Sequence, residues 1–136
     1  MATKIFVNLP VKDLDRSIAF FTSLGFDFNP QFTDEKAGCM VISDSIFAML
    51  LTEPYFKTYT QKAVSDAKTS TEVLIALDAQ SKEEVRQTVA KAKNAGAVIY
   101  NEPQDHGWMY VHSFADLDGH QWELIYMDQT QLPNQE

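Results

Sequence analysis

The sequence is short of the features that mark several protein classes: it has one cysteine, few basic residues and no long apolar run. Cys39 has no partner for an internal disulfide, and its place in the apolar run 39–42 predicts a buried, unreactive thiol. Eleven Lys and Arg against nineteen Asp and Glu give a net charge of −8, which argues against nucleic acid and anionic membranes as partners. No stretch approaches the roughly 18 apolar residues of a membrane span, and no signal-peptide core precedes the first strand-like segment. We therefore expect a cytoplasmic protein.

The motifs of two common enzyme classes are also missing. No Gly-x-Ser-x-Gly occurs, and Cys39 has no evident partner base, so hydrolase triads have no support. No glycine-rich loop is present to cradle a phosphate, which argues against nucleotide hydrolysis.

What is present is one pattern of secondary structure written twice. In the first copy, a strand over residues 5–11 leads to a helix that starts after the N-cap Asp13 and ends at Gly25. The apolar runs 39–42 and 46–51 then predict a hairpin.

The second copy follows a polar stretch over residues 53–71. A strand over residues 73–77 precedes a helix with the capping box Ser81-x-x-Glu84 and a stop at Gly96. Further strands are predicted at 98–100, 109–115 and 121–127, and Asp116–Gly119 forms the turn between the last two, with Asp116 and Asp118 serving that turn.

The second copy has the order β-α-β-β-β, and we expect the first to follow the same plan, so the fold class is α+β. With 136 residues, 45% of them hydrophobic, the chain forms a single domain. The predicted parts are module one at about 4–52, a linker at about 53–71, module two at about 72–128 and a polar tail at 129–136.

Two segments resemble a known family. Residues 11–25 follow the pattern V-x-D-L-D-R-S-I-x-F-F-x-x-L-G, and residues 116–124 follow D-x-D-G-H-x-x-E-L. Together with the doubled module, they resemble the vicinal oxygen chelate superfamily of glyoxalases, bleomycin-resistance proteins and extradiol dioxygenases, over residues 4–128. The resemblance implies a curved mixed eight-stranded sheet around a cavity, helices on its convex face, and a homodimer.

The resemblance also implies where a metal would be held. Metal-dependent members such as lactoylglutathione lyase place His, Gln or Glu ligands on the first and last strands of each module. Carried onto this sequence, those positions fall on Phe6, Leu50 (Met49 if the alignment shifts by one), Leu74 and Glu123. Phenyl and aliphatic groups offer no lone pairs, so we expect no metal at the family position and no cofactor.

The alternation of side chains along strands predicts which residues share the cavity face. If Ala115 pairs with His120, then His112 lies opposite Glu123 and Tyr110 lies opposite Ile125. The pair of His112 and Glu123 suits catalytic proton transfer, but it also suits a satisfied polar pair without catalytic function.

Three interpretations of function remain open. The first is a binder of a small, largely apolar molecule, and the second is a metal-dependent lyase or dioxygenase with a divalent ion on Glu123, His112 and His106. The third is an interaction module whose cavity is filled by its own side chains. The expected ligand contacts are Phe6, Asn8, Leu50, Leu74, His106, Trp108 and Tyr110. Tyr55, Phe56 and Tyr59 near the site are either ordinary packing or an additional stacking surface.

Overall fold

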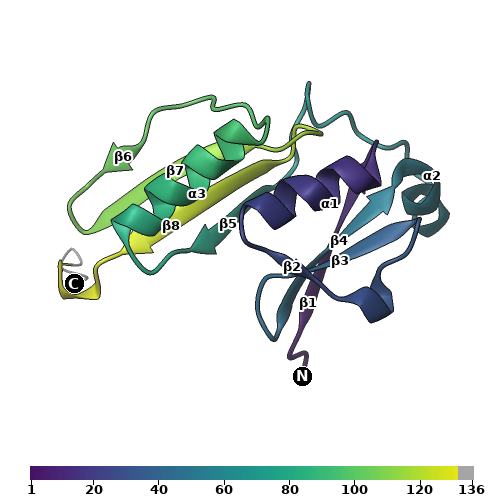
Figure 1. Cartoon of the computed structure of the whole chain (residues 1–136), viewed down its shortest axis with the longest axis horizontal. Coiled ribbons are helices and arrows are strands. Elements are labelled where there is room, and N and C mark those ends of the chain that lie inside the picture. The colour runs from purple at the N-terminus through teal and green to yellow at the C-terminus, as the bar shows by residue number, and fades with distance from the viewer. Residues whose placement is uncertain (132–136) are drawn as a thin grey trace. The chain divides into compact units, whose positions relative to one another are not determined.

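The computed structural model describes residues 1–131 and has two compact units, Met1–Ser65 and Asp66–Glu136 (Figure 1). The first unit contains module one and the second contains module two. Each has a mixed four-stranded sheet with a helix packed on one face. The α+β class and the doubled module are confirmed, and within residues 1–131 the eight strands form two separate sheets. The predicted tail is described only as far as Gln131.

The first unit is built on a sheet with the strand order β1-β4-β3-β2, in which β1 and β4 are parallel and the other pairs are antiparallel. Its strands and main helix are β1 (Ile5–Val11), α1 (Leu14–Ser23), β2 (Asp27–Phe28), β3 (Ala37–Val41) and β4 (Ile46–Thr52). Three short helices are η1 (Pro30–Phe32), α2 (Glu53–Phe56) and η2 (Lys57–Tyr59). The predicted hairpin is the β3–β4 pair.

The second unit repeats this plan with the order β5-β8-β7-β6. Its elements are β5 (Leu74–Asp78), α3 (Lys82–Asn94), β6 (Gln104–Asp105), β7 (Met109–Ala115), β8 (Gln121–Met127) and the short helix η3 (Gln129–Gln131). The strand predicted at 98–100 is wrong, because only Val98 forms a bridge there, with Ala115. The segment that pairs with β7 lies instead at β6.

Both main helices begin and end as the sequence predicts. The Asp13 side chain accepts from the backbone N–H of Arg16, and the Ser81 hydroxyl accepts from the N–H of Glu84. Gly25 and Gly96 have φ values of +106° and +108°, a region that side-chain-bearing residues avoid. These local signals fix where each helix stops before the chain returns to its sheet.

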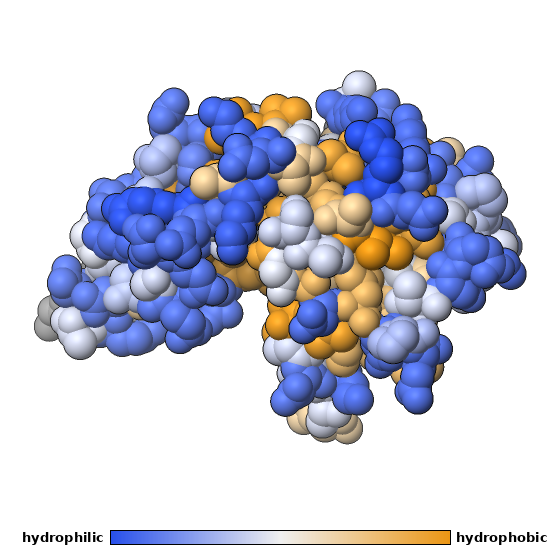
Figure 2. Space-filling view, viewed as in Figure 1, coloured by the Kyte–Doolittle hydropathy of each residue, from blue (hydrophilic) through white to orange (hydrophobic). Residues whose placement is uncertain are grey.

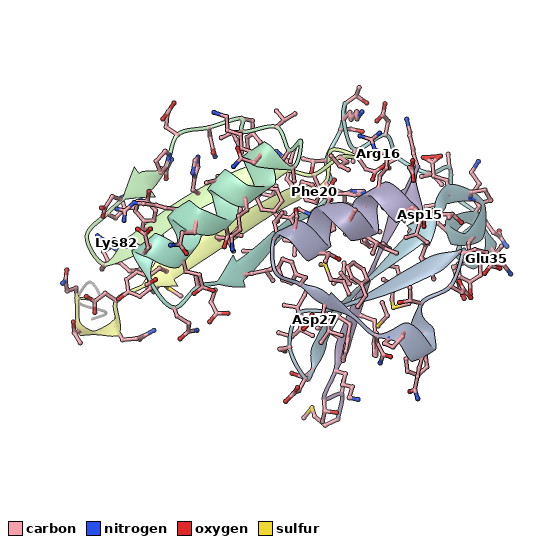
Figure 3. The ribbon with its side chains drawn as sticks, viewed as in Figure 1. Asp15, Arg16, Phe20, Asp27, Glu35 and Lys82 are labelled. Atoms are coloured by element: carbon pink, nitrogen blue, oxygen red, sulfur yellow. The ribbon has the colours of Figure 1, made fainter. Side chains whose placement is uncertain are left out.

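The core lies between each helix and one face of its sheet. On α1, Phe20, labelled in Figure 3, and Phe21 are buried with their rings edge to face. The predicted burial of Cys39 is confirmed, since 2% of the residue is exposed, and burial raises the pKa of its thiol. The opposite sheet faces are open, because Phe6 on β1 and Leu74 on β5 are 51% and 56% exposed. No helix within residues 1–131 is long and apolar enough to cross a membrane.

Candidate functional site

The open face of the first unit carries a cavity of about 760 Å³. The β1–β4 register pairs Phe6 with Phe47 and Asn8 with Met49, so these four side chains lie on one face of the sheet. The strand residues that line the cavity are Phe6, Asn8, Cys39, Phe47, Met49 and Leu51. The remaining lining residues, outside these strands, are Lys4, Asn29, Phe32, Phe56, Tyr59 and Thr60. Hydrophobic residues also reach the surface elsewhere along this unit (Figure 2).

Aromatic rings form one wall of this first-unit cavity. The rings of Phe6 and Phe47 are stacked, with centroids 4.8 Å apart and planes inclined by 11°. The Lys4 ammonium lies 5.9 Å from the Phe47 ring centroid, within reach of a cation–π interaction. Because Phe6 is half exposed, a ligand can reach the ring at this end of the stack.

A second aromatic pair lies where β4 passes into the short helices. The hydroxyls of Tyr55 and Tyr59 are 2.7 Å apart, and their rings meet edge to face at 5.3 Å. The hydrogen bond with Tyr55 raises the pKa of Tyr59, which keeps its phenol neutral near pH 7. Of the three aromatic residues that the sequence places near the site in this segment, Phe56 and Tyr59 line the cavity.

The predicted pairing of His112 with Glu123 is wrong. The register pairs Ala115 with Gln121, which sets Ser113 opposite Glu123 and His112 opposite Leu124. Adjacent residues of a strand point to opposite faces, so His112 and Glu123 lie on different sides of the sheet.

The turn before β8 explains this shift of one residue. Asp116 pairs with His120, and the Gly119 N–H donates to the Asp116 carbonyl, so the loop has three residues. Gly119 has a φ of +95°, as expected of a type I turn followed by a left-handed residue. The prediction assumed a loop of four residues, and the difference reverses the face of every residue on β7.

His112 and Tyr110 consequently belong to the α3 side of the second unit. The Nε2 of His112 lies 3.0 Å from the Asn101 carbonyl, and because a carbonyl only accepts, this nitrogen carries the proton. The Tyr110 side chain is buried, and the Cζ atom of the Arg86 guanidinium lies over it, 4.9 Å from the centroid of the Tyr110 ring. Lys82, labelled in Figure 3, pairs with Asp105 at 3.1 Å on the same side. Tyr110 therefore lies on the face of the sheet opposite to the one that the prediction assigned to it.

The chain matches the model of the Glyoxalase/Bleomycin resistance protein/Dioxygenase superfamily over residues 5–124. It belongs to this superfamily. A hypothetical protein from S. aureus is 31% identical, with a TM-score of 0.79 and coverage of 93% of this chain and 94% of that one. A search of curated proteins finds no match.

Two more distant structures share the fold. The fosfomycin resistance protein of Listeria monocytogenes is 22% identical, with a TM-score of 0.69 and coverage of 99% of this chain and 96% of that one. A superfamily enzyme from Burkholderia phytofirmans is 16% identical, with a TM-score of 0.76 and coverage of 90% and 96%.

The registers of the two sheets relate the positions that the sequence resemblance assigns to metal ligands. In the first module, β1 pairs with β4, so that Phe6 lies beside Phe47 and Asn8 beside Met49. In the second module, β5 pairs with β8 in the same way, so that Leu74 lies beside Gln121 and Ala76 beside Glu123. Met49 therefore matches Glu123. Of the two residues that the resemblance allows at the second position, Leu50 pairs with Gly38 and Leu9 and is fully buried, whereas Met49 lines the cavity.

The positions that the sequence resemblance assigns to metal ligands offer few donor atoms. The four positions hold Phe6, Met49, Leu74 and Glu123, and only Glu123 offers the oxygen donors of such a site. Within residues 1–131, no group of three or more His, Cys, Asp or Glu residues is arranged to hold a metal ion.

The shifted set of Glu123, His112 and His106 is not brought together either. The N–H of His106 donates to Met109, four residues along β7 from the partner of Glu123. At about 3.3 Å per residue, this is a separation of roughly 13 Å along the strand. Trp108 lies beside this turn, and its carbonyl accepts from the Asp128 N–H at 2.7 Å.

Two of the predicted ligand contacts lie in the candidate cavity. Phe6 and Asn8 line the cavity, as their alternation from the family position predicts. Leu74 lies on the open face of the second unit beside Gln121, outside this cavity. Phe47 was missed, although pairing β1 in parallel with β4 would have found it.

Proposed function

We propose that this superfamily member binds a small, largely apolar molecule in the first-unit cavity, without a metal at the superfamily's position. The lining of the cavity carries the proposal: a volume of about 760 Å³ is typical of small-molecule sites, and its walls are mostly aromatic and aliphatic. The fold of the superfamily supports it, and so does the absence of metal-ligand chemistry at Phe6, Met49 and Leu74.

The energy for binding comes from covering exposed apolar surface. Phe6 is half exposed, while Leu51 and Cys39, which also line the cavity, are almost fully buried. A ligand that covers the Phe6 ring gains about 25 cal/mol for each Å² of apolar surface removed from water. Asn8 and Thr60 supply polar groups at the same cavity and can orient the ligand.

We expect the neutral dye N-phenyl-1-naphthylamine to bind with a saturable rise in fluorescence. Phe47→Ala removes half of the stacked wall and should weaken binding about tenfold, the effect expected of one aromatic contact. Tyr100→Ala is the matched control, because Tyr100 is 41% exposed in the second unit and should leave dye binding unchanged. Circular dichroism melts check that each variant is folded. No saturable dye binding, or equal loss in both variants, would contradict the proposal.

We expect no stoichiometric metal in protein purified without a chelator or affinity tag and measured by inductively coupled plasma mass spectrometry. The physical reason is the donor set, in which three of the four positions carry no ligand of the superfamily's type. Calorimetric titration with Zn²⁺ and Ni²⁺ should likewise give no saturable heat. One bound ion per chain, lost in Glu123→Gln, would favour the alternative of a metal-dependent lyase or dioxygenase.

A further inference from the structure

We propose that the ligand of the first-unit cavity is a planar aromatic anion, such as an aromatic carboxylate. Its ring would extend the stack of Phe6 and Phe47, and its anionic group would face the Lys4 ammonium. The inference rests on the proposed function and names the chemical class of its ligand.

The shape of the aromatic wall favours a planar ring. Phe6 and Phe47 are nearly parallel and stacked one over the other, so Phe6 offers a ligand the flat outer face of its ring rather than the notch of an edge-to-face pair. Aromatic rings prefer offset-stacked or edge-to-face contacts, and such contacts add to the gain from simple burial. A planar ligand can therefore continue the stack over the half-exposed Phe6, whereas a saturated body of similar size gains only the burial.

The charge of the cavity favours an anion. Among its lining residues, Lys4 carries the only charged side chain. The thiol of Cys39 and the phenol of Tyr59 are both neutral near pH 7, because burial raises the first pKa and the hydrogen bond with Tyr55 raises the second. No carboxylate is among these residues, so a cationic ligand would find no ion-pair partner there.

The net charge of −8 disfavours binding of an anion, whereas Lys4 favours it. Which effect is larger depends on how far each charge lies from the ligand. The Debye length at physiological ionic strength is about 8 Å, so acidic residues farther away are largely screened. Lys4 lines the same cavity and lies 5.9 Å from the Phe47 ring centroid, and none of the lining residues is acidic. We therefore expect the charge of Lys4 to outweigh the net negative charge for a ligand in this cavity. The amide of Asn8 and the hydroxyl of Thr60 can donate further hydrogen bonds to the anion.

Competition against bound N-phenyl-1-naphthylamine tests the charge preference. Three naphthalene probes differ in charge near pH 7: 2-naphthoate is anionic, 2-naphthol is neutral and 2-naphthylmethylammonium is cationic. We expect 2-naphthoate to bind about fivefold more tightly than 2-naphthol, the effect of one partly exposed ion pair, and the cation to bind most weakly. The preference should shrink as salt is added.

Lys4→Gln should abolish the difference between 2-naphthoate and 2-naphthol. Lys12→Gln is the matched control, since it removes the same charge just after β1, outside the cavity lining, and should keep the preference. Equal affinities in the wild type, or an unchanged preference in Lys4→Gln, would overturn the inference while dye binding would still support the proposed function. If calorimetry detects neither the dye nor 2-naphthoate, both fail together.

A saturated analogue tests the stacking. Decahydronaphthalene-2-carboxylate has the charge of 2-naphthoate and a similar carbon skeleton without the aromatic face. We expect the aromatic acid to bind two- to tenfold more tightly, the range for an aromatic contact beyond burial. Phe6→Leu keeps an apolar side chain and should remove this difference. Tighter binding of the saturated acid to the wild type would contradict the stacked arrangement.

Discussion

Asp116→Ala should lower the free energy of unfolding by about 3–5 kcal/mol, the largest effect that we expect of any polar substitution. The Asp116 carboxylate accepts three hydrogen bonds, each 3.0 Å long, from the backbone N–H groups of Asp118 and His120 and from the Trp122 indole N–H. Only 1% of Trp122 is exposed, so its indole N–H would be left buried without this acceptor. Alanine removes all three acceptor contacts at once.

Urea denaturation measures this loss, with Asp44→Ala as the matched control. Asp44 is an exposed aspartate in the loop between β3 and β4, and its removal should change stability by less than about 0.5 kcal/mol. Trp122→Phe removes the indole donor, so a double-mutant cycle with Asp116→Ala should show coupling of about 1 kcal/mol or more. Additive losses in that cycle would mean that the indole bond contributes little.

The same carboxylate should make stability depend on pH. Burial raises the pKa of Asp116 above its ordinary value, so the folded state holds this proton more tightly than the unfolded state. The free energy of unfolding should then fall as the pH rises from the ordinary value near 4 to the raised value, and stay level above it. Asp116→Asn cannot titrate, so the stability difference between wild type and this variant should shrink over that window. A stability difference that grows with pH would mean that folding lowers the pKa of Asp116 instead of raising it.

The sequence was sufficient for the order and ends of most elements, because those depend on local chemistry. Asp13 and Ser81 cap their helices through contacts three residues away, and Gly25 takes the backbone conformation that ends α1. The strand predicted at 98–100 failed for a tertiary reason: Val98 meets Ala115 at a single bridge, and the chain pairs again only at β6.

The candidate site was less predictable, because it depends on register. The loop that ends at Gly119 is one residue shorter than expected, so His112 lies on the α3 face rather than on the cavity face. A shift of one residue likewise separates Leu50 from Met49 on β4. Contacts from irregular segments, such as Phe32 and Tyr59, follow no period and become visible only in three dimensions. Phe6 was predictable because the family position and the strand alternation both specify it.

Gly119→Ala should destabilise the second unit by about 3 kcal/mol, through two separate effects. The first is its φ of +95°, which a residue with a side chain adopts at a penalty of about 1–2 kcal/mol. The second is a clash, since an added Cβ would lie 2.8 Å from the carbonyl carbon and oxygen of Ala67 and from the nitrogen of Lys68. These are backbone atoms, so relief requires the 67–68 segment or the turn itself to move.

Gly25→Ala separates the two effects, because it has the strain without the clash. Its φ is +106°, yet no heavy atom lies within 4 Å of the position that a Cβ would take. Urea denaturation should therefore show a loss of about 1–2 kcal/mol for Gly25→Ala, with the excess in Gly119→Ala measuring the clash. Equal losses of stability in the two variants would mean that the 67–68 backbone moves away from the added Cβ at no measurable cost. Since the Gly119 turn sets the register of β7 against β8, a large excess would also show that this register is held from outside the hairpin, by the chain that leads into β5.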